Sequence, residues 1–159
     1  MEKTRRVDQD YRLVNLLVIA SQVLGRIRKS ELAPHDITPE ASRVMMSIQN
    51  LGDKATSAEI SRYIFREPNS VSEILSRMQS KGLIIRKKPS KGKTQIIGLT
   101  EKGKQTLEDI SKAKEASLGY VIAFMSDEEE LKMISELEEL VNRSFQKLGM
   151  SRIPRISWP

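Results

Sequence analysis

Apolar residues recur at helical spacing over most of this chain. In the first such segment, from about Asp8 to about Leu32, they fall three or four positions apart, and interspersed valines widen the apolar stripe. A helix that is apolar over more than half of its circumference is buried on several sides or pairs with another chain. A second helix is predicted to begin at Pro39, with Thr38 as its cap, and to end at Gly52.

Two shorter helices are predicted next, with a proline between them. Thr56 and Glu59 have the spacing of a capping box and mark the start of the first. Pro68 starts the second, which runs to about Lys81, because proline is tolerated in a first helical turn but not inside a helix. From Val71, apolar residues of this helix recur at helical spacing. The opposite face is polar and holds Ser70, Ser72, Glu73, Ser76, Arg77 and Gln79.

The period changes after Gly82. The runs LIIRKK and QIIGLT are rich in β-branched residues, and the segment between them contains the turn residues Pro89 and Gly92. This pattern predicts a two-stranded hairpin. Thr100 then caps a long helix that is expected to reach about Met125.

A last helix is predicted from Ser126, which forms a second capping box with Glu129, to about Leu148. The complete order is helix, helix, short helix, helix, hairpin, helix, helix. The expected fold is therefore mainly α-helical with one small β-hairpin. Its middle part is a helix-turn-helix followed directly by a hairpin wing, which is an α+β winged helix-turn-helix.

Composition removes several classes of protein. The chain has 159 residues, no cysteine and one histidine, His35, so disulfides and thiolate zinc sites are excluded. We find no nucleophile–base pair, glycine-rich phosphate loop or metal constellation, and we expect neither an enzyme nor a cofactor. No apolar run reaches the length of a membrane span, and the first residues lack the order of a signal peptide. The expected location is the cytoplasm, without membrane contact.

The positive charge of the chain is concentrated in one region. Net charge is +6, yet no acidic residue lies between Glu73 and Glu101, an interval that contains seven lysines and arginines. A second region, from Ser126 to Glu139, carries an excess of acidic residues. Focused positive charge favours an anionic partner, and double-stranded DNA is the leading candidate.

The polar face of the helix after Pro68 suits the major groove of DNA, which admits an α-helix. Ser70, Ser72 and Ser76 are small donors and acceptors that let the helix backbone approach the bases. Arg77 can reach a phosphate or a guanine. Glu73 has two readings that the sequence leaves open: it accepts a hydrogen bond from cytosine, or it pairs with Arg77 one turn later.

The hairpin would contact the DNA backbone and the minor groove, where negative potential attracts basic side chains. Thr56 and Ser57, at the start of a helix, would position a phosphate. The predicted contacts of the hairpin are Lys87, Lys88, Lys91, Lys93 and Thr94.

At this level the chain resembles the MarR (multiple antibiotic resistance regulator) family of transcription factors. The segments TSAEISRYI, NSVSEILSRMQSKGLI and LTEKGKQTLEDI carry the resemblance. It implies a homodimeric repressor that binds a pseudo-palindromic operator and is released by a small aromatic or anionic effector. It also implies dimerisation helices at residues 1–35 and 101–159 around a DNA-binding lobe at 36–100. Effector-lining candidates are Tyr11, Met46, Tyr63 and Tyr120.

The hairpin departs from the family pattern. Members commonly carry Asp-x-Arg near the tip, where this chain has Lys91 and Lys93. A lysine lacks the planar, bidentate guanidinium of arginine. We therefore expect a wing that binds phosphate more than it selects bases. The alternative to a gene-specific regulator is a sequence-tolerant architectural protein of the nucleoid type.

Overall fold

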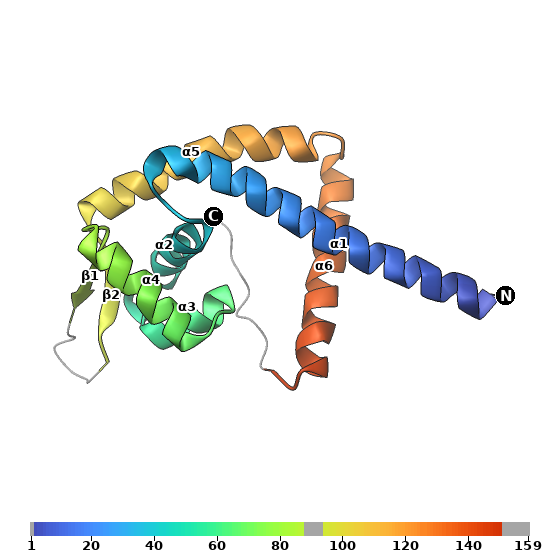
Figure 1. Ribbon diagram of the computed structural model, residues 1–159, viewed down its shortest axis with the longest axis horizontal. Helices are drawn as coiled ribbons and strands as arrows, with labels where there is room; N and C mark the ends of the chain where they lie inside the picture. The colour runs from blue at the N-terminus through green and yellow to red at the C-terminus, as the bar shows by residue number, and fades with distance from the viewer. Residues whose placement is uncertain (1, 88–93, 151–159) are drawn as a thin grey trace. The chain divides into compact units, whose positions relative to one another are not determined.

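The computed structural model describes residues 2–87 and 94–150 (Figure 1). The chain divides into two compact units, Met1–Pro39 and Glu40–Pro159. The first unit consists of helix α1, Glu2–Leu32, and a short 3-10 helix, Ala33–His35. Helix α1 begins well before the predicted Asp8. Apolar periodicity cannot mark this earlier start, because the first turns consist mostly of charged and polar residues, among which Glu, Lys and Arg favour a helix.

The apolar stripe of α1 is open to solvent in the single chain. Leu13, Leu16 and Ile19 are each 54% exposed. Among the side chains of α1 whose burial the structure describes, Leu32, at the end of the helix, is the one that is fully buried.

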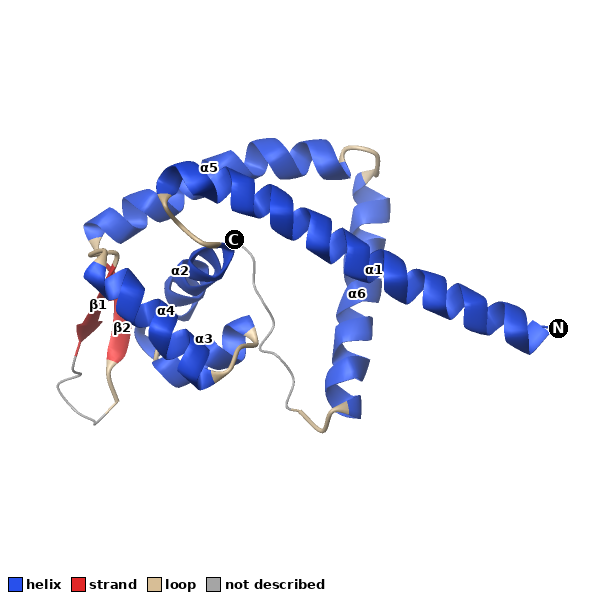
Figure 2. Cartoon of the chain, viewed as in Figure 1, coloured by secondary structure: helices blue, strands red, loops and turns tan. Residues whose placement is uncertain are grey.

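The second unit contains the predicted helix-turn-helix, the hairpin and two long helices (Figure 2). Each predicted element is present, with ends that differ from the prediction by a few residues at most. The bounds are α2, Pro39–Leu51; α3, Ser57–Ile64; α4, Pro68–Ser80; β1, Ile84–Lys87; β2, Ile96–Leu99; α5, Glu101–Ile122; and α6, Asp127–Lys147.

An aliphatic core holds α4 by one face. Val71 and Leu75 of this helix are fully buried, as are Met45 of α2 and Ile60 of α3. Met78, at the next position of the stripe, is 2% exposed. Burying side chains of this size contributes about 1.5–3 kcal/mol each. The core therefore fixes which face of α4 points outward.

The hairpin is tied to the rest of the unit by backbone hydrogen bonds. Strands β1 and β2 are antiparallel, with Ile84 opposite Leu99 and Arg86 opposite Ile97. The Ile97 amide donates to the carbonyl of Ala55, just before α3, over 2.7 Å. The base of the hairpin is thus joined to the start of the helix-turn-helix.

The hairpin also joins directly onto α5 through four residues that we call the Thr100 junction: Gly82, Leu83, Thr100 and Gly103. The Thr100 hydroxyl donates to the Gly82 carbonyl over 2.7 Å and accepts from the Gly103 amide over 3.0 Å. The Thr100 amide donates to the Leu83 carbonyl over 3.1 Å. A Cβ added at Gly103 would lie 2.1 Å from that carbonyl oxygen, so only glycine permits this approach.

Helix α6 starts with the predicted capping box and presents an open apolar face. Both arms of the box, between Ser126 and Glu129, are formed. Hydrogen bonds from the Ser126 amide and hydroxyl lower the pKa of the Glu129 carboxyl. The helix has no buried residue. Its exposed apolar residues are Leu131, Met133, Ile134, Leu137, Leu140 and Val141.

No helix within the described ranges has the length and hydropathy that crossing a membrane requires.

Candidate nucleic-acid interface

Helix α4 presents all five predicted groove-contacting residues to solvent. Residues three or four positions apart share one face of a helix. The buried stripe of Val71, Leu75 and Met78 therefore leaves the predicted contacts on the opposite face. The exposed residues are Ser70, Ser72, Glu73, Ser76 and Arg77. A hollow of about 510 Å³ lies among the last four of them, and Asn69 completes its lining. Sequence reasoning missed Asn69, whose position beside Pro68 in the first turn of α4 was the available signal.

Glu73 and Arg77 form the ion pair that was one of the two readings of Glu73. The distance from Arg77 Nη2 to Glu73 Oε2 is 3.2 Å, and the two side chains are 72% and 70% exposed. An exposed pair spaced by one helical turn contributes only about 0.3–0.5 kcal/mol. Arg77 can therefore leave Glu73 for a stronger external acceptor at little cost.

The hydroxyl of Ser76 is already engaged within the helix. It donates to the Ser72 carbonyl over 2.9 Å. Ser76 consequently offers an incoming base its oxygen lone pairs rather than its proton. This makes Ser76 an acceptor on a face where Arg77 is a donor.

Thr56 and Ser57 lie at the start of α3, as predicted. Thr56 accepts from the Glu59 amide over 3.2 Å, which is the expected cap. The Glu59 carboxylate bonds Arg62, although the sequence predicted a capping box that would turn this carboxylate back towards Thr56. The oxygen of Thr56 is thus used by its own helix, which leaves its proton as the group to offer a phosphate.

The hairpin places two predicted contacts in described positions. Lys87 ends β1 and Thr94 precedes β2, and both are exposed. The other three predicted wing contacts, Lys88, Lys91 and Lys93, lie outside the described residues.

The sequence did not predict a side-chain hydrogen bond that joins α4 to the hairpin. Arg86 of β1 donates from Nε to Oε1 of Gln79 over 3.0 Å. The two residues are seven positions apart and lie on either side of the turn at Gly82. No periodic pattern spans a helix, a turn and a strand, so the sequence offered no signal for this pair.

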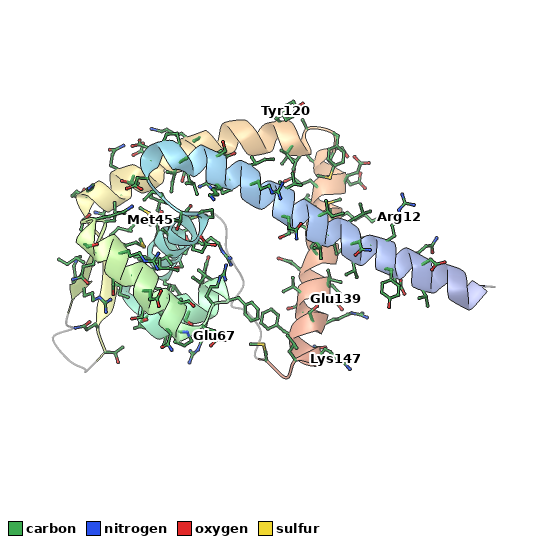
Figure 3. The ribbon with its side chains drawn as sticks, in the orientation of Figure 1. Arg12, Met45, Glu67, Tyr120, Glu139 and Lys147 are labelled. Carbon is green, nitrogen blue, oxygen red and sulfur yellow. The ribbon has the colours of Figure 1, made fainter. Side chains whose placement is uncertain are left out.

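The four predicted effector residues lie on four different helices, α1, α2, α3 and α5. Tyr63 is half-buried and its hydroxyl accepts from Asn50 over 2.8 Å, whereas Tyr120 is 88% exposed on α5 (Figure 3). Met46 is half-buried on α2, and Tyr11 is 68% exposed on α1. A groove of about 690 Å³ is formed by the end of α2, strand β2 and the start of α5. None of the four residues lines this groove, and their effector role stays a prediction.

Within residues 2–87 and 94–150, no three acidic or histidine side chains are grouped for binding a metal ion.

Comparison with known proteins identifies relatives for the middle of the chain and for most of its length. The model of the MarR family matches residues 35–93. A helix-turn-helix transcriptional regulator from Bacillus cereus is 31% identical over 115 residues, which cover 70% of this chain and 74% of the relative. A regulator from Bacillus anthracis is 30% identical over the same length. These relatives are transcriptional regulators and not enzymes, as the sequence predicts.

Solved structures share the fold over a larger part of the chain. The ligand-free organohalide-sensing regulator RdhR-CbdbA1625 is 24% identical, with a TM-score of 0.82 over 94% of this chain and 90% of that chain. The Staphylococcus aureus MepR–DNA complex is 22% identical, with a TM-score of 0.74 over 80% and 93%. The described elements, from α2 to the hairpin and the long helices around them, match this winged-helix architecture. The chain therefore belongs to the MarR family of winged helix-turn-helix transcriptional regulators.

Proposed function

We propose that this protein is a homodimer that binds a pseudo-palindromic DNA operator and represses transcription from it. The observation that carries the proposal is the exposed polar face of α4, which the core holds outward and the hairpin follows directly. Such a helix fits the major groove while the hairpin reaches the flanking backbone. Two structures of this fold, S. aureus MepR and a variant of Escherichia coli MarR, were solved with DNA.

Four side chains of the face contact DNA in this proposal. Arg77 leaves Glu73 and donates to guanine or to phosphate. The contact with guanine would be bidentate, with two hydrogen bonds to one base. Ser70 and Ser72 lie close to the bases, and Ser76 accepts from them. Lys87 and Thr94 contact the DNA backbone beside the groove, with Lys88, Lys91 and Lys93 as further wing contacts.

The second copy of the chain would cover the apolar surfaces of the long helices. Exposed apolar residues follow α1 and α6 over most of their length. Patches of this extent on a single chain mark an interface with another chain. A two-fold dimer would place two α4 helices on half-sites about one helical turn, roughly 10 bp, apart.

Release by a small aromatic or anionic compound completes the proposal. The organohalide-sensing regulator is 27% identical in its form bound to 2,4-dichlorophenol, with a TM-score of 0.74 over 84% of this chain and 80% of that chain.

Selection of bound duplexes from a random pool tests the proposal directly. We expect an inverted repeat whose affinity for the protein falls about a thousandfold between 50 and 200 mM salt, as it does for proteins that make six to ten phosphate contacts. Competition with scrambled duplexes is the control. If scrambled DNA competes as well as the selected site, the protein is architectural, and the regulatory proposal is wrong.

Replacing Arg77 with alanine should change the base preference of the protein. We expect discrimination at one position of each half-site to fall about tenfold or more, since a bidentate contact contributes about 1–3 kcal/mol. Repeating the selection with Arg77→Ala measures this. Arg143→Ala is a matched control, because Arg143 forms the same kind of exposed pair with Glu139, on α6. An unchanged preference in Arg77→Ala would remove Arg77 from base reading.

A further inference from the structure

The bond between Gln79 and Arg86 connects two elements that would both contact DNA. Gln79 lies near the end of α4, and Arg86 lies in the middle of β1. Arg86 Nε donates to Gln79 Oε1 over 3.0 Å, a normal length for such a bond. The guanidinium of the strand is therefore held at a fixed place beside the helix.

The partner of Arg86 orients it without neutralising it. Gln79 is an uncharged amide, so Arg86 keeps its full positive charge. Arg77, by contrast, is paired with the carboxylate of Glu73. A guanidinium has five N–H donors, of which this bond uses one. The two terminal nitrogens retain the fork geometry that matches two phosphate oxygens.

Burial and surrounding charge support the same role. Arg86 is half-buried, so part of its side chain is already ordered, and ordering it on binding costs less entropy. The segment from Ile74 to Thr100 contains no carboxylate of its own. Arg86 thus lies in the most cationic stretch of the chain, next to the face of α4.

We infer that Arg86 binds a phosphate of the operator and that Gln79 is its positioning residue. This inference rests on the proposed function. In the sequence, Lys91 and Lys93 stand where the Asp-x-Arg pattern of the family would place an aspartate and an arginine. The pair supplies an oriented guanidinium at the base of the hairpin instead. Because the amide comes from α4, a phosphate held by Arg86 fixes the helix and the hairpin together.

The experiment is a salt titration of operator affinity with single and double variants. We expect Arg86→Ala to lower affinity about tenfold for all duplexes and to reduce the salt slope by about one, as loss of a phosphate contact does. Arg86→Lys should keep the slope, because the charge remains, and recover only part of the affinity. Circular dichroism and the dimer mass establish that each variant is folded.

Gln79→Met tests the positioning role, since methionine has similar length but no amide. We expect an affinity loss of a few fold, an unchanged base preference, and no further loss when Gln79→Met is added to Arg86→Ala. Gln105→Met, which removes an exposed glutamine of α5 that bonds Asp109, is the matched control.

Three results would overturn the inference. An unchanged salt slope in Arg86→Ala removes Arg86 from phosphate binding. Additive losses in the double variant, or an altered base preference in Gln79→Met, remove the positioning role of Gln79. Failure of the proposed function would look different, because the unmodified protein would then show no preference for any selected duplex.

Discussion

Replacing Leu137 with aspartate should convert the proposed dimer into monomers and weaken operator binding by about a hundredfold or more. Leu137 is 40% exposed on the apolar face of α6, beside Ile134 and Val141. A second chain that covers this face would have to bury the new carboxylate, which costs several kcal/mol. Two lobes linked in one dimer bind with an avidity about 10²–10⁴ times that of one lobe, and this advantage would be lost. Sedimentation and a gel-shift titration measure the two effects.

Ser135→Asp is the matched control for this change. It adds the same charge to the same helix, at an exposed position that the apolar stripe does not include. We expect it to leave both mass and affinity nearly unchanged. A Leu137→Asp protein that remains dimeric would show that this face of α6 is not the contact surface.

Replacing Gly103 with alanine should lower the free energy of unfolding by about 2–3 kcal/mol. The added Cβ would lie 2.1 Å from the Leu83 carbonyl oxygen, which is backbone and cannot swing aside. Either α5 or the start of β1 must move, and the hydrogen bonds of the Thr100 junction would stretch. Thermal unfolding followed by circular dichroism should show a midpoint lower by roughly 5–10 °C.

Gly119→Ala is the corresponding control in the same helix. A Cβ at Gly119 meets no atom within 4 Å. Alanine favours a helix over glycine by up to about 1 kcal/mol, so this variant should be as stable as the unmodified protein or slightly more stable. Equal stability of Gly103→Ala and Gly119→Ala would mean that the close approach to Leu83 does not constrain residue 103.

The helices and the hairpin could be predicted because their signals are local. Thr56, Thr100 and Ser126 each cap a helix as their spacing indicated. The exposed face of α4 followed from periodicity alone. The start of α1 was missed because its first turns contain few apolar residues. The predicted hydrogen bond from the Thr56 amide to the Glu59 carboxylate was also wrong. That carboxylate instead accepts from Arg62, one turn along α3.

The parts of the candidate site that depend on tertiary contacts could not be predicted. The Glu73–Arg77 pair is a local contact within one helix, and the sequence could therefore offer it as one of two alternatives. The Gln79–Arg86 bond crosses a turn whose geometry the sequence does not specify in enough detail. The role of Gly103 also depends on how closely α5 approaches Leu83. A glycine in the sequence shows that the position has no side chain. It does not show which atom of the folded chain packs against the position.

The Thr100 junction has a mechanical consequence. Thr100 directly precedes α5, and its hydroxyl donates to the carbonyl of Gly82, in the turn that follows α4. The start of α5 is therefore hydrogen-bonded directly to the turn that ends α4. A rotation of the first turn of α5 must carry Leu83, and with it the beginning of β1. A disturbance that turns α5 would therefore move hairpin and helix-turn-helix as a rigid body.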